Sequence, residues 1–330
     1  MKEFDYRRAP DVPGAVALLD TDPHARYLAG GTNLVDLMKC GVERPARLVD
    51  VRHLPLDRIE PAPDGGLRVG ATVTNSDLAA HPDVRSHYPM LAQAVLAGAS
   101  GQLRNMATVG GNLLQRTRCA YFTDTTKPCN KRTPGSGCPA LSGEHHNHAI
   151  LGATETCVAV HPSDMAVALT ALDAVVHYET AHGTGELPLE RMYLPVAGTP
   201  HRETALPAGA LITGLSLPPV PVAASSRYRK VRERASYAFA LASVAAAIDI
   251  RDGIVRDARL AFGAVASRPW RARAAERALI GAPATAETYA AAAEAELRAA
   301  RPLPHNGYKV TLIRNLTVAV LSKLHEEATR

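Results

Sequence analysis

The spacing of apolar residues divides the chain into regions with different expected structure. In the first 55 residues, short apolar strands alternate with segments of helical spacing. Strands are predicted at 4–6, 25–28 and 47–51, and helices are predicted to begin at Asp11 and Thr32, the second capped by Thr32. The order β-α-β-α-β predicts a small α/β unit.

Between residues 56 and 220 the pattern changes to short alternating strands separated by turn residues. Asp64-Gly65-Gly66 before the alternating segment 67–73 predicts a hairpin. Further strands are predicted at 174–178 and 211–217, and helices at 89–97 and 164–173. Residues 117–157 lack periodicity and are rich in Pro, Gly, Thr and His, which predicts a long loop; loops of this length inside a domain are usually functional.

The prolines at 218, 219 and 221 mark the best candidate for a linker. After it the pattern predicts a basic strand, an apolar strand over 237–250, a turn at Asp252-Gly253, another strand and two helices. The last helix carries one apolar stripe, which is typical of a core-facing helix. We therefore predict an α+β protein with parts at 1–55, 56–220 and 221–330, the second a mainly antiparallel sheet.

The composition is that of an ordinary globular protein, with 330 residues, 46% hydrophobic and 21% charged. The longest apolar runs, such as 238–248, fall well short of the roughly 20 residues that cross a bilayer, so no membrane insertion is expected. The N-terminus, MKEFDYRRAP, is charged where a signal peptide needs an apolar stretch. A cytoplasmic location is expected from this chain's own sequence. A periplasmic location is the alternative, because a folded complex can be exported by the signal peptide of a partner subunit.

The net charge of +5 is diffuse except in the basic segment 227–234. Interleaved with tyrosine, that segment could grip nucleic acid. A basic strand edge, or one or two residues that reach a cofactor phosphate, is the more ordinary interpretation. No nucleic-acid partner is predicted.

Two glycine turns suggest a phosphate site. Leu28-Ala-Gly-Gly-Thr-Asn-Leu34 places two glycines between a strand and a helix, where backbone N–H groups can approach an anion closely. Thr108-Val-Gly-Gly-Asn112 supplies a second turn that could clamp a pyrophosphate from the other side. By spacing, the first turn matches neither a dinucleotide nor a Walker fingerprint. Without a ligand, a tight turn capped by Thr32 explains the first motif, and a bulge or hairpin turn explains the second.

The cysteines are the second chemical signal. Four of the five, Cys119, Cys129, Cys138 and Cys157, fall in the long loop, whereas Cys40 is expected to be a small buried hydrophobe. The spacing alone does not separate an iron–sulfur cluster from zinc or from four unrelated thiols. Histidines 145, 146 and 148 lie in the same loop and are expected to be solvent-exposed rather than metal ligands.

Together these motifs resemble the FAD-binding subunit or domain of the molybdenum hydroxylases, the family of xanthine dehydrogenase, aldehyde oxidoreductase and carbon monoxide dehydrogenase. The resemblance is carried by LAGGTNL and TVGGNLLQ, then by His161-Pro-Ser-Asp164, Leu217-Pro218 and Tyr228-Arg-Lys230 in the family's order. It implies two FAD-binding subdomains followed by a C-terminal flavoprotein domain.

The resemblance also implies a role for each motif residue. The residues that would wrap the FAD pyrophosphate are Leu28, Ala29, Gly30, Gly31, Thr32, Asn33 and Leu34, and those that would close the other side are Thr108, Gly111 and Asn112. Asp164 would bind the ribose or adenine end, and Lys230 would contact the flavin side. Without a cofactor, Asp164 could cap the following helix and Lys230 could be a surface cation.

The cysteine loop resembles a subgroup, the flavin subunits of 4-hydroxybenzoyl-CoA reductase and periplasmic aldehyde oxidoreductase, which carry an additional [4Fe-4S] cluster. The resemblance implies that the four loop cysteines are its ligands, with zinc the less favoured alternative.

The implied function is electron transfer. In the family, a large subunit with a molybdenum cofactor oxidises the substrate, a small subunit carries two [2Fe-2S] clusters, and the FAD subunit exchanges electrons with an external acceptor. This chain is expected to be the middle component of a heterotrimer, with no catalytic acid or base of its own. A freestanding FAD oxidase and a zinc-stabilised binding module are the alternatives. The sequence does not indicate the substrate of the complex or the electron acceptor.

Overall fold

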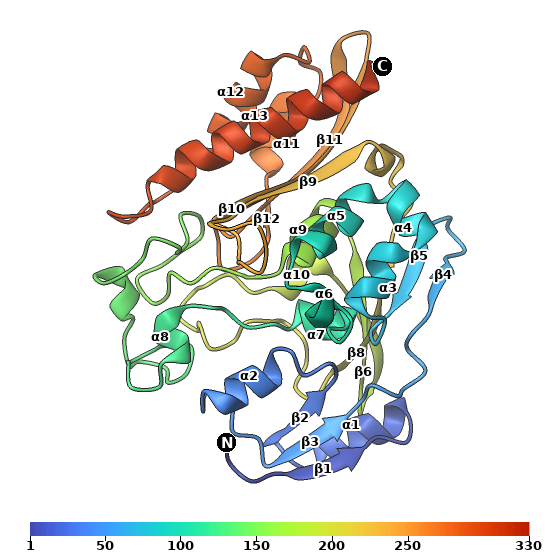
Figure 1. Ribbon diagram of the computed structural model, residues 1–330, viewed down its shortest axis with the longest axis vertical. Coiled ribbons are helices and arrows are strands. Elements are labelled where there is room, and N and C mark those ends of the chain that lie inside the picture. Colours follow the sequence, from blue (N-terminus) through green and yellow to red (C-terminus); the bar gives the residue numbers. More distant parts are fainter. Residues whose placement is uncertain (330) are drawn as a thin grey trace.

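The N-terminal unit follows the predicted order. In the computed structural model, which describes residues 1–329, its elements are β1 (Asp5–Arg8), α1 (Val12–Asp20), β2 (Ala25–Leu28), α2 (Leu34–Lys39) and β3 (Arg47–Asp50). The strands form a parallel sheet in the order β1-β3-β2, at the bottom of Figure 1. Asp11 caps α1 by accepting a hydrogen bond from the Gly14 N–H. At α2, however, Asn33 and not Thr32 is the capping residue.

The second region is built on a five-stranded antiparallel sheet in the order β4-β5-β8-β6-β7. Its strands are β4 (Ile59–Pro61), β5 (Leu67–Gly70), β6 (Val175–Thr180), β7 (Gly183–Pro188) and β8 (Leu211–Leu217). Its helices are α3 (Asn75–Ala80), α4 (Pro82–His87), α5 (Pro89–Ala97), α6 (Gly101–Arg104), α7 (Val109–Leu113), α9 (Asp164–Ala171) and α10 (Leu189–Met192). Every residue of α9 is buried, which explains why all of them except Asp164 and Thr170 are apolar.

The segment 117–157 is the predicted long loop. Its only regular elements are α8 (Ala120–Thr123) and the 3₁₀ turn η1 (Pro139–Leu141). The loop lies to one side of the molecule, at the left of Figure 1.

The C-terminal region is a four-stranded antiparallel sheet in the order β12-β11-β10-β9, with helices on one face (Figure 1). The strands are β9 (Ser226–Val231), β10 (Ala242–Arg251), β11 (Ile254–Gly263) and β12 (Trp270–Arg271), and the helices are α11 (Arg273–Leu279), α12 (Ala286–Leu297) and α13 (Tyr308–Ala328). Alternate residues of β10 enter different cores: Val244 and Ala246 join the core under these helices, whereas Ala245 and Ala247 join the core of the second region.

The proline-rich connection is packed rather than free. Val222 and Ala223, in the 3₁₀ turn η2 (Pro221–Ala224), are buried in the core of the second region. The outer edge of the basic strand β9 is covered by α5, where the Gln93 side chain accepts a hydrogen bond from the Tyr228 N–H at 2.8 Å. The basic segment is therefore part of an interdomain contact and not a free edge.

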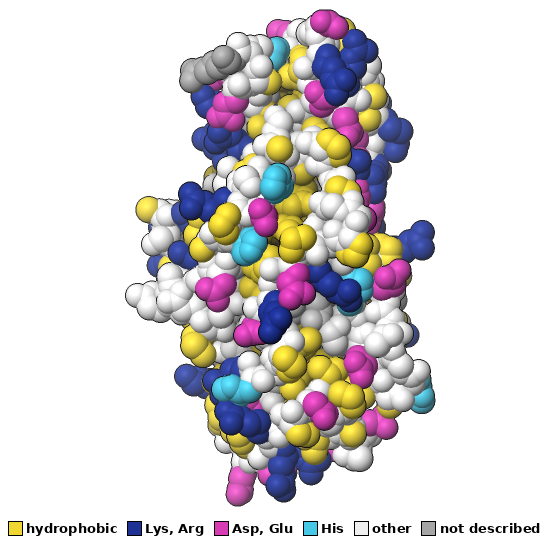
Figure 2. Space-filling model, turned by 90° about the vertical axis from the view of Figure 1, so that its right-hand side faces the viewer, with side chains coloured by type: hydrophobic (Ala, Val, Ile, Leu, Met, Phe, Trp, Pro, Cys, Tyr) yellow, Lys and Arg dark blue, Asp and Glu magenta, His cyan; other side chains and the backbone are white. Residues whose placement is uncertain are grey.

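The surface mixes charges. On the face shown in Figure 2, Lys and Arg side chains lie among Asp and Glu side chains, with hydrophobic side chains exposed between them. Over residues 1–329, no helix combines the length and apolar character that crossing a membrane requires.

Candidate functional site

Both glycine turns open onto one cleft of about 860 Å³. Its walls come from the N-terminal unit, from the second region and from the connection between β9 and β10. The predicted residues that line it are Gly30, Gly31, Thr32, Asn33, Gly111, Asn112, Asp164 and Lys230. Leu28, Ala29, Leu34 and Thr108 are chain neighbours that do not line it. Segments more than 190 residues apart thus meet at a single site.

The first glycine turn is held by close backbone approach. A Cβ atom on Gly30 would lie 1.8 Å from the carbonyl oxygen of Met106, so a side chain cannot be accommodated unless the two chains separate. Gly31 has φ +73°, in the left-handed region that favours glycine. These requirements exist without a ligand, and they bring bare main chain to the wall of the cleft.

Asn33 gives this turn an available donor. Its side-chain oxygen accepts a hydrogen bond from the Arg116 N–H at 2.9 Å. Its Nδ2 is buried and has no hydrogen-bond partner among residues 1–329. Because an unmade hydrogen bond at a buried amide is costly, this donor in the cleft wall suits a polar ligand atom.

The second glycine turn begins a helix. Thr108 caps α7 by accepting from the Gly111 N–H at 3.2 Å. The side-chain oxygen of Asn112 accepts hydrogen bonds from Ser163 at 2.6 Å and from Gln115 at 2.8 Å. The turn is therefore tied to the residue that caps α9, and the simple bulge or hairpin does not occur.

Asp164 and Lys230 form a buried ion pair. The Lys230 ammonium is 2.7 Å from one carboxylate oxygen of Asp164, and the Tyr228 hydroxyl donates to the other at 2.5 Å. The two charged side chains are 3% and 8% exposed. Burial, together with the adjacent carboxylate, raises the pKa of Tyr228 well above its usual value, so the phenol stays a donor.

This pair bears on the expected assignments. Because Asp164 and Lys230 contact each other, the two side chains reach the same part of the cleft, and the part of FAD that each would contact stays a prediction. Asp164 is not the helix cap, because Ser163 has that role, and Lys230 is not a surface cation. Lys230 further donates to the Ala97 carbonyl oxygen at 3.2 Å, which ties β9 to the end of α5.

Arg118 is a cleft residue that the motifs did not indicate. Its guanidinium lies 5.1 Å from the ring centre of Phe239 and 3.4 Å from a carboxylate oxygen of Asp36. Its Nε is buried without a partner in the described part of the chain. Both Arg118 and Phe239 line the cleft, as does Tyr237. The only sequence signal was the pair of aromatic residues, Tyr237 and Phe239, that follows the basic segment 227–234.

The four loop cysteines line one small cavity. Cys119, Cys129, Cys138 and Cys157 surround it together with Tyr121, Phe122 and neighbouring loop residues. Burial raises the pKa of Cys119 to about 11, and burial also raises the pKa of Cys138 and of Cys157. Cys40 does not line the cavity: it lies exposed at the end of α2, so the expectation that it is buried is wrong.

A charged network fastens this loop to the rest of the molecule. Arg116 contacts Glu43 at 2.6 Å and Glu203 at 3.2 Å, and Lys131 contacts Glu203 at 2.8 Å. Burial alone would raise the pKa of Glu203, but the two cations outweigh it and lower that pKa. Through Arg116, just before the loop, and Lys131, within it, the network connects the loop to Glu43 of the N-terminal unit and to Glu203 of the second region.

The loop histidines also differ from expectation. His146 is exposed, but His145 and His148 are buried, with 2% and 8% of their surface accessible. His148 Nε2 lies 3.2 Å from the sulfur of Cys119. Burial, with the nearby Lys309, lowers the pKa of His148 to about 4, so its ring is neutral near pH 7. The expectation of exposure failed for His145 and His148 because it was based on the polar composition of the loop, which does not show which residues are covered by other segments.

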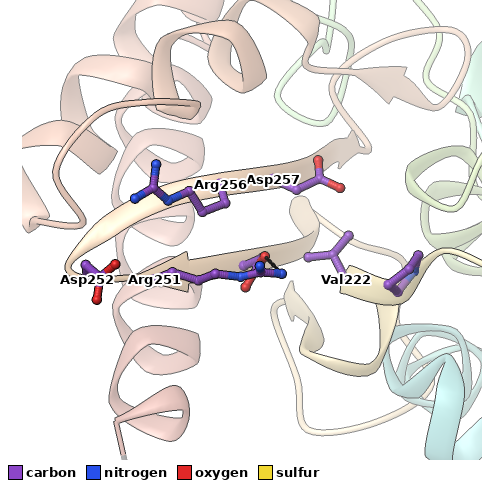
Figure 3. Close-up of a pocket in the computed structure, with 7 residues that line it drawn as sticks. Val222, Arg251, Asp252, Arg256 and Asp257 are labelled. Carbon is purple, nitrogen blue, oxygen red and sulfur yellow. Dashed lines mark ion pairs between the residues drawn. The ribbon is translucent and has the colours of Figure 1, made fainter.

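Another hollow lies at the far end of the C-terminal sheet (Figure 3). It is lined by residues of the β10–β11 hairpin, including Asp249, Arg251, Asp252, Arg256 and Asp257. Arg251 and Asp249 pair with each other at 3.0 Å, as the dashed line shows. None of the predicted site residues lines this hollow; most of them line the glycine cleft or the cysteine cavity instead.

Two family models together cover most of the chain. The family model described as "FAD binding domain in molybdopterin dehydrogenase" matches residues 2–220, and "CO dehydrogenase flavoprotein C-terminal domain" matches residues 218–324. The chain therefore belongs to the family of FAD-binding subunits of molybdenum hydroxylases, and it is a flavoprotein subunit of an oxidoreductase.

Relatives and solved structures agree with this assignment. The chain is 51% identical to the aldehyde oxidoreductase FAD-binding subunit PaoB of Escherichia coli strain K12, covering 99% of this chain and 100% of that one. It is 27% identical to the glyceraldehyde dehydrogenase medium chain of Sulfolobus acidocaldarius, covering 84% and 82%. A chain of quinoline 2-oxidoreductase from Pseudomonas putida 86 has the same fold, with a TM-score of 0.77, 24% identity and full coverage of both chains.

Proposed function

We propose that the chain is the FAD and iron–sulfur electron-transfer subunit of a heterotrimeric molybdenum hydroxylase of the aldehyde oxidoreductase type. One observation carries the proposal: the adjacent residues Arg118 and Cys119 line the cleft and the cysteine cavity respectively. One peptide unit therefore joins the walls of the two sites, so that a cofactor in each would lie beside the same short stretch of main chain. The 51% identity to an aldehyde oxidoreductase subunit supports the enzyme class.

The cleft residues fit FAD. The two glycine turns present bare main chain, and Asn33 Nδ2 and Arg118 Nε are buried donors that lack partners within residues 1–329. We propose that 28–34 and Thr108, Gly111 and Asn112 hold the pyrophosphate region, while Lys230 supplies positive charge that Asp164 orients. When bound, FAD supplies a group that exchanges electrons singly or in pairs. The chain's own residues bind and orient it and shield it from water.

We propose that the cysteine cavity holds a [4Fe-4S] cluster. Within residues 1–329, no group of three or more His, Cys, Asp or Glu side chains is placed to hold a metal ion, so the four thiols would have to draw together around either zinc or a cluster. Four thiols surround a cavity, and a cubane is held by four thiolates, one on each iron. Because three of the thiols have raised pKa values, their protons must leave as the metal binds.

The proposed partners follow from this division of labour. A large subunit with a molybdenum cofactor would oxidise the substrate, and a small subunit with two [2Fe-2S] clusters would pass electrons to this chain. An external acceptor would take them from FAD. The three parts 1–55, 56–220 and 221–330 would then be two FAD-binding subdomains and the C-terminal flavoprotein domain.

Reconstitution tests the proposal. The isolated chain should contain FAD, iron and acid-labile sulfide, should be reducible by dithionite, and should not turn over aldehydes. Adding the two partner subunits should restore aldehyde-driven bleaching of the flavin. The Gly31→Asp chain should lose FAD, because a side chain and a negative charge would enter the pyrophosphate site. Turnover by the isolated chain would favour a freestanding oxidase, and zinc in place of iron would contradict the cluster.

A further inference from the structure

The start of α13 holds the part of the cysteine loop that lies behind Cys119. The fully buried side chain of Asn306 donates to the carbonyl oxygens of His148 and Ala149, each at 3.2 Å. The ammonium of Lys309, also fully buried, donates to the Asn147 carbonyl oxygen at 3.0 Å and to that of Ala264 at 2.8 Å. The main chain on both sides of His148 is therefore fixed to the C-terminal helix.

A neighbouring contact fixes the same segment through side chains. The His145 ring stacks on the His305 ring, with centroids 4.7 Å apart, and its Nε2 accepts a hydrogen bond from the His305 N–H at 3.1 Å. The other ring nitrogen of His145 contacts the Ala140 carbonyl oxygen at 3.1 Å. The loop backbone from 140 to 149 is thus held at several points, which leaves the His148 ring little freedom to move.

The His148 ring points one nitrogen at a cysteine sulfur. Nε2 is 3.2 Å from Cys119 Sγ, whereas Nδ1 is buried and contacts no hydrogen-bonding group in the described chain. When Cys119 is a deprotonated cluster ligand its sulfur can only accept, so the N–H of the imidazole belongs on Nε2, the nitrogen that faces this acceptor. His148 does not line the cysteine cavity, so its ring stands behind the sulfur and outside the set of four thiols.

We infer that His148 is a positioning residue whose Nε2–H donates a hydrogen bond to the Cys119 thiolate and thereby makes the bound cluster easier to reduce. The inference rests on the proposed function in one respect, that the four cysteines hold a cluster. A donor to a ligand sulfur stabilises the reduced state more, because reduction adds negative charge to the cluster and its thiolates. Removal of the donor shifts the reduction potential to a more negative value.

The test is a redox titration of the complete complex, followed by electron paramagnetic resonance. His148→Phe removes the donor and keeps a planar ring, and His148→Gln keeps an N–H at a similar distance from the backbone. His146→Ala is the matched control, because this exposed histidine lies in the same loop and its ring stacks on Tyr308 without reaching a cysteine. Iron, acid-labile sulfide and FAD are measured for each protein.

The expected result is a more negative potential for the additional cluster in His148→Phe, a potential near that of the unmodified protein in His148→Gln, and no change in His146→Ala. Iron and FAD contents stay the same in all four proteins. An unchanged potential in His148→Phe with full iron content overturns the role of His148 and leaves the cluster proposal intact. Loss of iron from both His148 variants but not from His146→Ala also overturns it, because a ligand or a folding residue would behave in that way. Absence of the additional cluster from the unmodified complex would instead contradict the proposed function.

Discussion

The glycine cleft and the cysteine cavity are made in different ways. The cleft is formed where regular elements end: a strand-to-helix turn, the start of α7, the start of α9 and the end of β9. Its shape follows from main-chain packing, such as the approach of Gly30 to the Met106 carbonyl. The cavity is formed by irregular chain, whose position depends on two sets of side chains: Arg116 and Lys131, which form ion pairs, and Asn306 and Lys309, which donate to loop carbonyl groups.

Because the two sites are built differently, different substitutions should disrupt them. A site made by main chain fails when a side chain is added where there is no room. A site made by anchored loop fails locally when an anchor or a ligand is removed, because few elements of the fold depend on it. The following substitutions test that contrast, from the largest expected effect on the fold to the smallest.

Gly30→Ala should have the largest effect. Its methyl group would lie 1.8 Å from the Met106 carbonyl oxygen, so the N-terminal unit must move away from the second region. We expect a loss of about 3 kcal/mol or more in the free energy of unfolding, together with loss of FAD. Denaturant unfolding and FAD content measure both.

Gly101→Ala is the control, because a Cβ there meets no atom within 4 Å in residues 1–329. Its unfolding free energy should change by less than about 0.5 kcal/mol. Equal behaviour of the two variants would show that the close approach does not shape the cleft.

Lys230→Met should come next. It leaves the Asp164 carboxylate buried with only the Tyr228 hydroxyl as partner, which costs roughly 3 kcal/mol for a buried pair that loses its cation. FAD should also be retained less well. Arg229→Ala, an exposed position on the same strand, should change neither quantity. Unaltered FAD retention in Lys230→Met would remove Lys230 from the cofactor site.

Lys309 should make the stability of the native protein depend on pH. Burial lowers its pKa from 10.5 to about 7, so between these values the unfolded chain binds one more proton than the folded chain. The free energy of unfolding should therefore increase as the pH rises from about 7 to 10.5. We expect an increase of roughly 2 kcal/mol, less than the full pKa difference implies, because two carbonyl groups accept hydrogen bonds from the charged ammonium and offset part of its burial cost.

Lys309→Met lacks this titration. Unfolding of both proteins at pH 7, 8.5 and 10 should show the native protein gaining stability relative to the variant as the pH rises. Taking the difference cancels the tyrosines and cysteines that also titrate in alkali. A constant difference across the three pH values would mean that Lys309 stays charged in the folded protein.

Cys138→Ser should have the smallest effect on the fold and a complete effect on the metal. The variant should lose the iron and sulfide of the additional cluster and keep FAD, because the cavity is separate from the two glycine turns. Cys40→Ser, at an exposed thiol, should retain both cofactors. Loss of FAD from Cys138→Ser would show that the two sites do not fail independently.

The sequence predicted best those secondary-structure elements that depend on neighbouring residues alone. The β-α-β-α-β order, the hairpin after residue 58 and the final helix depend on apolar spacing and turn residues, and the structure has all of them. The glycine motifs led to the cleft because glycine at 30 and 31 is required by the backbone. The resemblance to a known family supplied the identity of the cofactor, which spacing alone did not.

What the sequence did not predict depends on contacts between distant segments. The pairing of Asp164 with Lys230 joins residues that no local pattern relates, and Arg118 meets Phe239 only in the folded chain. The burial of His145 and His148 was missed because polar residues in a proline- and glycine-rich loop suggest exposure. Their partners His305 and Asn306 lie more than 150 residues away.

The contact between Gly30 and the Met106 carbonyl also bears on when the cofactor arrives. Because main chain meets main chain there, the width of the cleft is set whether or not anything lies inside it. Binding then requires little rearrangement, and the entropy of ordering the walls has already been lost during folding. FAD should therefore be able to leave and return while the protein stays folded, so that loading of the flavin can follow assembly of the subunits and need not accompany synthesis of the chain.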